Sequence, residues 1–329
     1  MRLVSNLTRK VNNSLSILTL SLLLFSNHSL QANKQLPIIA ISQFISHEAL
    51  DATYNGLIDE LKKQGYIDGQ TIKIVYKNAA GNVGTNAAIA TYIKSINPTV
   101  AVGISTPSAQ ALVGIKSPLV FSSITDPVDA KLVNSLCNPG GNVTGVTDMP
   151  PVEEQIKLIK QVLPKAQLIA VPYCPGESNS VKQVEIITAM TQKHGLKVLL
   201  LPVTSSSQIK TALAKALDKK ADAYLIPLDN MMASAIQTIT SFATSMKIPV
   251  FASDNLHVIN NQALASVGLN YSDVGAKTGQ IVARILKGEK PGDIPVSTPD
   301  KANYYFNLET AKTLGIQIPE SLLKKTKLT

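Results

Sequence analysis

Two short stretches rich in hydroxyl and amide side chains directly follow apolar, strand-like runs of the sequence. They are Ser105 and Thr106, and Ser178, Asn179 and Ser180. In both places a helical pattern begins at once, so these side chains lie beside the unpaired N–H groups of a helix N-terminus. Such a strand-to-helix connection, called a corner below, can cap its own helix, or it can bind an anionic group of a ligand. Two corners of this kind, one in each half of the chain, suggest two lobes that hold a ligand between them.

Other corners after predicted strands supply carboxylates, amides and one aromatic ring. They are Gln43, Phe44, Asp126, Asp229, Asn230 and Asp254. In parallel α/β sheets ligands bind beyond the carboxyl ends of the strands, where these residues are predicted to lie. Each also has a purely structural alternative, since the aspartates could cap helices or turns and the phenylalanine could be core. Hydroxyls and helix N-termini for an anion, carboxylates for a cation and a ring for an apolar part would together suit an amino acid.

The sequence lacks the usual signatures of an enzyme. Ser178 is not part of a G-x-S-x-G turn, and the residues after the first predicted strand do not form a G-x-G-x-x-G loop. His47, His194 and His257 show no metal-ligand spacing with each other or with the cysteines. We therefore expect no catalytic residue, no metal and no cofactor.

The first 32 residues are predicted to be a signal peptide. Three positive charges precede the apolar run 15–25, and small residues then lead to a cleavage point after Ala32. No cysteine follows the apolar run to accept a lipid. We expect a soluble, non-lipidated periplasmic protein.

The net charge of +9 comes mostly from dispersed lysines, which argues against a nucleic-acid partner. Arg284 is the only arginine after residue 32, and it falls within a helical pattern. A ligand anion should therefore meet hydroxyls and helix N–H groups instead of a guanidinium. Cys137 and Cys174 could pair in an exported protein, and the sequence leaves that open.

Alternating strand and helix patterns predict an α/β fold of two doubly wound lobes with parallel sheets. We expect residues 33–144 and 255–296 to form the first lobe and residues 145–254 and 297–329 the second. The turn-rich segment 138–142 and the short run 143–147 are interpreted as the first crossing between them. The run 263–269 and the helix 274–286 are expected to return to the first lobe.

Several motifs resemble one protein family over nearly all of the chain after residue 32. They are Ser105-Thr106-Pro107-Ser108-Ala109-Gln110, Thr125-Asp126-Pro127-Val128, residues 139–146, Asn179-Ser180-Val181 and residues 249–254. The family is that of ABC-transporter substrate-binding proteins, with tryptophan- and aromatic-amino-acid-binding members. The resemblance implies the type I periplasmic binding protein fold, in which three hinge crossings join two lobes around a ligand. Pro172 and Cys174 depart from the family pattern.

The resemblance implies a monomeric periplasmic component of an ABC importer, whose partners are a membrane permease and its ATPase. We expect it to trap an amino acid, with an aromatic side chain, between the lobes. Hinge crossings are placed near residues 140–147, 254–264 and 294–299. The serines, Thr106 and Asn179 of the two corners are expected to hold the ligand carboxylate, and Asp229 or Asp254 its ammonium. The alternative is a sugar-binding protein of the same fold, although a chain with no tryptophan offers few stacking platforms.

Overall fold

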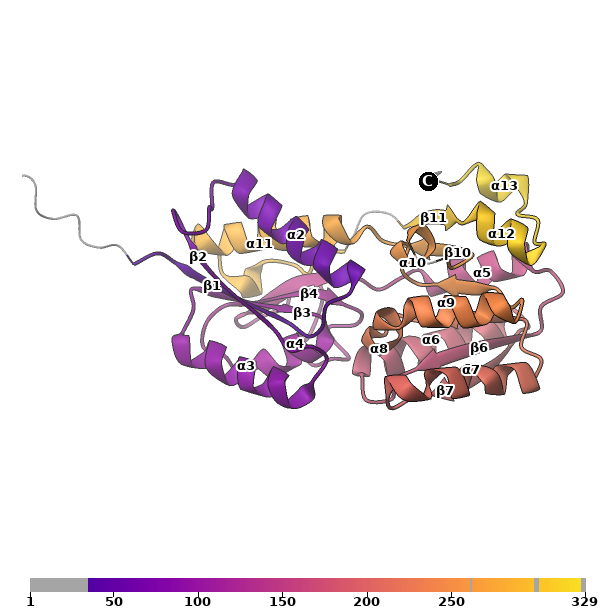
Figure 1. Cartoon of the computed structure of the whole chain (residues 1–329). Helices are drawn as coiled ribbons and strands as arrows, with labels where there is room; N and C mark the ends of the chain where they lie inside the picture. The colour runs from indigo at the N-terminus through magenta and orange to yellow at the C-terminus, as the bar shows by residue number, and fades with distance from the viewer. Residues whose placement is uncertain (1–34, 261, 299–301, 327–329) are drawn as a thin grey trace, which may run out of the picture. The chain divides into compact units, whose positions relative to one another are not determined.

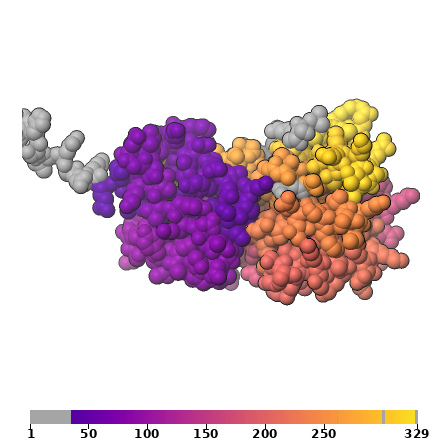
Figure 2. Space-filling view, in the orientation of Figure 1, coloured from indigo at the N-terminus to yellow at the C-terminus, as the bar shows by residue number. Residues whose placement is uncertain are grey.

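The computed structural model describes residues 35–260, 262–298 and 302–326, so the predicted signal peptide lies outside the described part. The described residues form two α/β lobes, each with its own sheet (Figure 1). In the space-filling view, purple N-terminal residues cover one lobe, whereas orange and yellow C-terminal residues cover much of the other (Figure 2). Among the described residues no helix has the length and apolar character to cross a bilayer.

The sheet of the first lobe has the strand order β2-β1-β3-β4-β5, and all its neighbours are parallel. Its strands are β1 (Ile38–Gln43), β2 (Lys73–Asn78), β3 (Val100–Ile104), β4 (Leu119–Ile124) and β5 (Val143–Thr147). Its helices are α2 (Glu48–Lys63), α3 (Val83–Ile96), α4 (Thr106–Leu112) and α11 (Tyr271–Leu286). Along β1, Ile39 and Ile41 pack toward α2 and α11, whereas Ala40 packs toward α3 and α4. Helices therefore cover both faces, which confirms the predicted doubly wound lobe.

The sheet of the second lobe has the order β11-β10-β9-β8-β6-β7, and only the β10–β11 pair is antiparallel among the described strands. Its strands are β6 (Leu168–Tyr173), β7 (Lys197–Pro202), β8 (Ala223–Ile226), β9 (Val250–Ala252), β10 (Ala265–Gly268) and β11 (Asn303–Phe306). Its longer helices are α5 (Val152–Val162), α6 (Ser178–Lys193), α7 (Ile209–Asp218) and α9 (Ile236–Ser245). Short helices are α8 (Asn230–Ser234), α10 (Leu256–Ile259), α12 (Leu308–Leu314) and α13 (Glu320–Leu323). Two 3-10 turns, η1 (Ser206–Gln208) and η2 (Pro291–Asp293), complete the described elements.

The structure corrects two of the predicted boundaries between the lobes. The run 143–147 is a full strand of the first sheet, because β5 pairs with β4, so the first crossing follows Thr147. The run 263–269 does not return to the first lobe, because β10 pairs with β9 and β11. The second crossing therefore lies between β10 and α11. Strand pairing decided both points, and a short apolar run does not reveal which sheet will accept it. Of the third predicted crossing, residues 294–299, residue 299 lies outside the described residues.

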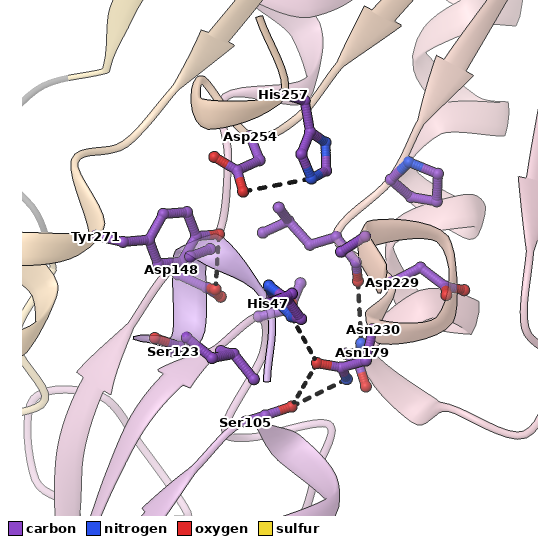
Figure 3. A pocket seen from close by; sticks show the side chains of 16 residues that line it. His47, Ser105, Ser123, Asp148, Asn179, Asp229, Asn230, Asp254, His257 and Tyr271 are labelled. Carbon is purple, nitrogen blue, oxygen red and sulfur yellow. Dashed lines mark hydrogen bonds and ion pairs between the residues drawn. The ribbon is translucent and has the colours of Figure 1, made fainter. Parts of the chain in front are cut away.

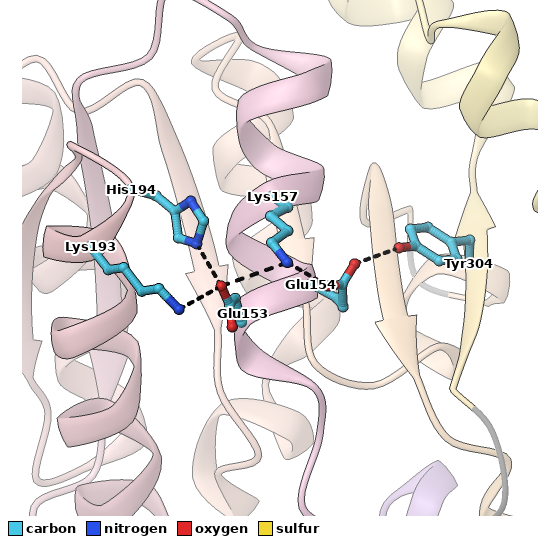
Figure 4. A network of polar contacts seen from close by, with 6 residues as sticks. All are labelled: Glu153, Glu154, Lys157, Lys193, His194 and Tyr304. Atoms are coloured by element: carbon cyan, nitrogen blue, oxygen red, sulfur yellow. Dashed lines mark hydrogen bonds and ion pairs between the residues drawn. The ribbon is translucent and has the colours of Figure 1, made fainter.

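Figure 4 shows a polar network on the second lobe that ties α5 to its neighbours. Glu153 contacts Lys193 at 2.9 Å and His194 at 3.1 Å at the end of α6. Hydrogen bonds from Lys193 and His194 hold the pKa of Glu153 at about 2. Glu154 accepts a hydrogen bond from Tyr304 of β11 at 3.1 Å. Because exposed ion pairs contribute little to stability, this network mainly fixes how α5 is oriented.

Cys137 and Cys174 are both free thiols, the first exposed and the second buried.

The chain returns to the first lobe through α11, which packs directly on α2 (Figure 1). Glycines allow the close approach: a Cβ on Gly275 would lie 2.1 Å from the Thr53 carbonyl oxygen, and one on Gly56 would lie 2.2 Å from the Ser272 carbonyl oxygen. Such distances leave no room for a methyl group beside backbone atoms. The contact joins segments more than 200 residues apart and closes the core of the first lobe.

We expect Gly275→Ala to lower the free energy of unfolding by about 2 kcal/mol, because overpacking outweighs the gain in helix propensity. Chemical denaturation followed by circular dichroism measures the change. Gly176→Ala is the control, since a Cβ there would meet only the Cys174 Sγ atom, at 3.7 Å, and should leave stability unchanged. A Gly275→Ala protein as stable as the parent would contradict the close-packing argument.

Candidate ligand-binding site

A small cavity of about 30 Å³ lies where the strand ends of the two lobes meet (Figure 3). Elements of the first lobe and of the crossings contribute His47, Ala49, Leu50, Ser105, Ser123, Thr125, Asp148 and Tyr271. The second lobe contributes Asn179, Pro227, Leu228, Asp229, Asn230, Ala233, Asp254 and His257. The cavity has room for about two water molecules, so a larger ligand requires the lobes to move apart.

Two carboxylates of this cavity are buried without a positive partner. Burial raises the pKa of Asp148 to about 7, although Tyr271 donates a hydrogen bond to its Oδ2 atom at 3.2 Å. Burial likewise raises the pKa of Asp254 to about 6, and its Oδ1 atom accepts the Leu256 N–H at 2.9 Å. Among the described residues that line the cavity there is no lysine or arginine. The site therefore lacks a cation to balance its carboxylates.

The two histidines of the cavity do not supply that cation. Burial lowers the pKa of His257 to about 4, and it lowers the pKa of His47 from 6.5 despite the charge of Asp254. Both rings are therefore neutral near pH 7. The Nε2 atom of His257 lies 3.6 Å from Asp254 Oδ2, which is too long for a strong hydrogen bond.

Several buried polar atoms find no hydrogen-bond partner within the described part of the chain. Four of them belong to residues that line the cavity: Asp148 Oδ1, Asn179 Oδ1, His47 Nδ1 and His257 Nδ1. An unpaired buried polar atom destabilises the protein, so its presence requires an explanation. Their shared position around one cavity makes this cavity a candidate site for a polar ligand.

Direct hydrogen bonds join the two lobes across the mouth of the cavity. Asn230 Nδ2 donates to Ser105 Oγ at 3.0 Å, and Asn230 Oδ1 lies 3.3 Å from His47 Nε2. Farther out, Lys182 of α6 lies 3.3 Å from Asp129. Ser105 is held with φ 76° and ψ 151°, a region that residues other than glycine rarely adopt. The lobes are therefore in contact, and a strained residue lies at their junction.

Five of the eleven predicted site residues line the cavity. They are Ser105, Asn179, Asp229, Asn230 and Asp254. The corners after β3, β6, β8 and β9 therefore do meet, as expected for the carboxyl ends of parallel strands.

The other six predicted site residues lie outside the cavity. Gln43 donates to Asp51 Oδ1 at 2.7 Å and to the Ile45 carbonyl oxygen, so it orders the loop before α2. Phe44 packs in the apolar core between β1 and α3, and it also borders a larger cleft of about 850 Å³ that Asn230 shares. Asp126 accepts the Val128 and Asp129 N–H groups and caps a turn. Asp126 has the turn-capping role and Phe44 the core packing that we considered as alternatives.

The remaining three, Thr106, Ser178 and Ser180, are not among the residues that line the cavity. Ser180 is fully buried and donates to Asp229 Oδ2 at 2.6 Å. Thr106 and Ser178 line a small hollow beside Asp126, and Ser178 also borders the cleft of about 850 Å³, where it lies 3.5 Å from Gln110. A helix start presents only one or two of its successive side chains to a given ligand, because each residue turns by about 100°.

The Asp229 carboxylate is fully occupied by its own lobe. Its Oδ1 atom accepts the Met232 N–H at 2.8 Å and caps α8. Its Oδ2 atom accepts both Ser180 Oγ and the Cys174 N–H at 2.6 Å. Burial raises the pKa of Asp229, and these three donors oppose that shift. Asp229 therefore anchors the loop before α6 to β8.

Sequence reasoning missed important residues of the site. They are His47, Ser123, Asp148, Glu177, His257 and Tyr271. Asp148 directly follows the run 143–147, and it would have been found if that run had been recognised as a strand. Glu177 lay within the stretch before α6 but carried no motif of its own. Tyr271 lies at the start of a helix, and its sequence position gave no signal.

Among the described residues no group of three His, Cys, Asp or Glu side chains could hold a metal.

Comparisons with known proteins place this geometry in context. A family model described as ABC transporter substrate binding protein matches residues 38–329. A tyrosine-binding protein of Clostridioides difficile is 36% identical over 281 residues, which are 85% of this chain and 81% of that protein.

Two solved structures cover nearly the same part of the chain. An ABC domain from Streptococcus pneumoniae in complex with L-Trp is 37% identical, has a TM-score of 0.85 and covers 89% of this chain and 99% of its own. The ligand-free, open structure of a substrate-binding protein with adhesive properties from Clostridium difficile is 35% identical and covers 89% and 99%, but has a TM-score of 0.68. At nearly equal identity, this structure is more similar to the L-Trp complex.

We expect Asp229→Asn to lower the free energy of unfolding by about 2 kcal/mol. The new amide would point an N–H group at the Cys174 or Met232 N–H group and leave a buried donor unpaired. Asp254→Asn is the matched control, because its amide oxygen still accepts the Leu256 N–H and a buried charge is removed. Urea denaturation of both variants tests this. Equal stability of the Asp229→Asn variant and the parent would rule out the anchoring role.

A pH dependence follows from the buried carboxylates. Because the folded-state pKa of Asp148, about 7, exceeds its ordinary value of 3.8, the folded protein holds more protons than the unfolded chain in this range. The free energy of unfolding should therefore fall as pH rises through 7. Glu177, with a pKa raised to about 7 by burial, acts in the same direction. The histidines oppose this only below their ordinary pKa of 6.5.

Between about pH 6.5 and pH 8 the melting temperature of the ligand-stripped protein is thus expected to fall as pH rises. Asp148→Asn should reduce this dependence, whereas Asp126→Asn should leave it unchanged. A pH profile that is identical in the parent and in the Asp148→Asn variant would refute the assignment.

Proposed function

The chain belongs to the family of ABC transporter substrate-binding proteins, and we propose that its ligand is an amino acid with an aromatic side chain. The observation that carries this proposal is the pair of buried carboxylates, Asp148 and Asp254, in a cavity without a lysine or arginine among its described lining residues. An amino acid supplies a cation on a small, polar frame. The similarity to a tyrosine-binding protein and to an L-Trp complex supports the aromatic side chain.

We assign the ligand ammonium to Asp254 and Asp148 and not to Asp229. The three donors that occupy Asp229 leave it little capacity to accept more, whereas Asp148 Oδ1 has no partner among the described residues. A cation placed between the two aspartates would favour their ionised forms and offset the cost of burying them.

We assign the ligand carboxylate to hydroxyl groups of the first lobe. Ser105 and Ser123 line the cavity and both carry hydroxyls that can donate. Arg284 lies outside the site, where it pairs with Glu289. The expected guanidinium-free recognition of the anion is therefore retained, with Ser123 added and with Ser178, Ser180 and Thr106 left out.

A sugar is the weaker alternative for this site. A neutral sugar would leave Asp148 and Asp254 buried without a counter-charge, which is a costly arrangement. Structures of relatives with bound sugars or polyols, at 13–16% identity, share the fold only. An amino acid satisfies both carboxylates.

Ligand entry requires the lobes to separate about their crossings. The cavity of about 30 Å³ is too small for an aromatic amino acid, and hydrogen bonds of Asn230 close its mouth. The greater similarity to the L-Trp complex than to an open, ligand-free relative supports a closed arrangement here. We infer that a ligand with contacts in both lobes shifts the equilibrium toward the closed state, and small-angle scattering should show a smaller radius of gyration with ligand.

We propose that the protein is exported, cut after Ala32 and released without a lipid. It would then work as a monomer that binds its ligand unchanged and delivers it to a permease and its ATPase, with no nucleic-acid partner. Membership in a family of solute-binding proteins supports this. Mass spectrometry of periplasmic material should find Asn33 as the first residue, and a chain that keeps Met1 would contradict export.

We expect Asp254→Asn to weaken binding of tyrosine or tryptophan by about thirtyfold or more, because loss of one partner from a buried charge pair costs about 2–5 kcal/mol. Calorimetric titration of refolded, ligand-stripped protein against amino acids and sugars is the measurement. Asp126→Asn is the control, since that residue caps a turn outside the cavity. Binding of sugars but not of amino acids, or an unchanged affinity in Asp254→Asn, would overturn the proposal.

A further inference from the structure

We propose that the Glu177 carboxylate, acting through the side-chain amide of Asn230, holds His47 with its proton on Nε2, so that His47 Nδ1 accepts a hydrogen bond from the ligand ammonium. The identity of the ligand group rests on the proposed function, whereas the state of His47 does not. Glu177 and Asn230 are thus positioning residues, and His47 is a binding residue that the sequence did not reveal.

The chain of contacts begins at Glu177, a buried residue directly before α6. Its Oε2 atom accepts the Asn230 backbone N–H at 3.2 Å, and its Oε1 atom accepts the Met231 N–H at 3.3 Å. Burial raises the pKa of Glu177 to about 7, so above that pH the group is a carboxylate and both of its oxygens act as acceptors. The N–H groups in the first turn of α8 therefore fix the position of the carboxylate and its role as a hydrogen-bond acceptor.

Because Glu177 accepts, it fixes the orientation of the Asn230 side-chain amide. Its Nδ2 group donates to Glu177 Oε2, and a flipped amide would place a carbonyl oxygen against the carboxylate. Orientations of amide side chains are decided by such networks. Asn230 Oδ1 consequently faces the first lobe, where Ser105 Oγ lies at 3.2 Å and His47 Nε2 at 3.3 Å.

An acceptor facing His47 Nε2 requires the proton on that nitrogen. Burial lowers the pKa of His47 below 6.5, and the nearby His257 acts in the same direction. The charges of Asp254 and Asp51 and the hydrogen bond with Asn230 oppose this shift. The ring is therefore neutral near pH 7, and one nitrogen of a neutral imidazole carries a lone pair. That nitrogen is Nδ1, which is buried and has no partner among the described residues.

The same carboxylate orients a second amide. Asn179 Nδ2 donates to Glu177 Oε2 at 3.3 Å and to the Leu228 carbonyl oxygen at 3.0 Å. Asn179 Oδ1 is thereby left on the cavity side, buried and unpartnered within the described chain. Figure 3 shows Asn179, Asn230 and His47 around the same space as Asp254 and Asp148.

The result is a cavity wall composed largely of acceptors. A primary ammonium has three N–H donors, and Asp148, Asp254 and His47 Nδ1 offer three acceptors from three different elements. Each N-methyl group on the ligand removes one donor and leaves an acceptor unpaired. The site should therefore discriminate against N-methylated amino acids, in line with the strong rejection of analogues that lack a required polar group.

The first test is independent of any ligand. In the ligand-stripped protein with ¹⁵N-labelled histidine, nuclear magnetic resonance at about pH 8, where Glu177 is ionised, should show His47 as a neutral ring protonated on Nε2. The His47→Asn variant identifies its signals. A ring protonated on Nδ1, or an imidazolium, would overturn the inference even if amino acids bind as proposed.

The second test separates positioning from a merely structural role. In Glu177→Gln the side chain carries both a donor and an acceptor, so Asn230 can adopt either orientation and the Nδ1–H form of His47 should become populated. We expect an affinity for tyrosine or tryptophan about tenfold lower. Glu153→Gln, an exposed change on the same lobe (Figure 4), is the matched control. If the His47 signal is unchanged in Glu177→Gln, whatever the melting temperature of the variant, Glu177 does not position His47 through Asn230.

The third test concerns the ligand group. The parent protein should bind N-methyltyrosine or N-methyltryptophan at least about tenfold more weakly than the unmethylated amino acid. The His47→Ala variant should lose part of this discrimination, because one acceptor has been removed. Equal affinity of the parent for both forms would show that His47 Nδ1 does not accept from the ammonium. Failure to bind any amino acid would instead refute the proposed function.

Discussion

The burial of two carboxylates in one cavity, with no lysine or arginine among the described lining residues, is the constraint on which the rest of the site depends. Burial raises the pKa values of Asp148 and Asp254 because ionisation in a poorly solvated place is costly. A soluble fold tolerates this arrangement when a ligand supplies the missing charge. In the proposed function, the cost of these carboxylates in the closed, ligand-free state and its relief by a cation couple lobe closure to binding.

The fold provides the rigid frame that this coupling requires. Parallel strands in both lobes direct their carboxyl ends toward one cavity, so residues distant in sequence meet there. The glycine contact between α2 and α11 closes the first lobe with a helix that follows the second sheet in sequence. Asp148 and Tyr271 lie at the ends of two crossings and join in one hydrogen bond of 3.2 Å, so the site includes the segments about which we propose that the lobes move.

Contacts between the lobes divide into two kinds. Ion pairs such as Lys182 with Asp129 are partly exposed and contribute little to stability. The Asn230 amide, in contrast, is buried between Glu177 of its own lobe and Ser105 and His47 of the other. A buried amide with fixed neighbours transmits orientation as well as energy, because each donor must face an acceptor. The junction thereby determines which atoms of the cavity accept and which donate.

The sequence by itself determined the α/β class, the doubly wound lobes and the corners after β3, β6, β8 and β9, because hydrophobic periodicity and helix-start residues are local signals. With Arg284 as the only arginine after residue 32, it also predicted that a ligand anion meets hydroxyls and helix N–H groups instead of a guanidinium. Only the tertiary structure decided that Asp229 anchors a loop while Asp254 and Asp148 face the cavity, because a carboxylate's role depends on which donors surround it. Only strand pairing placed β5 in the first sheet and β10 in the second, since a short apolar run fits either. His47, Glu177 and Tyr271 became part of the site through contacts between segments far apart in the chain, and no local pattern encodes such contacts.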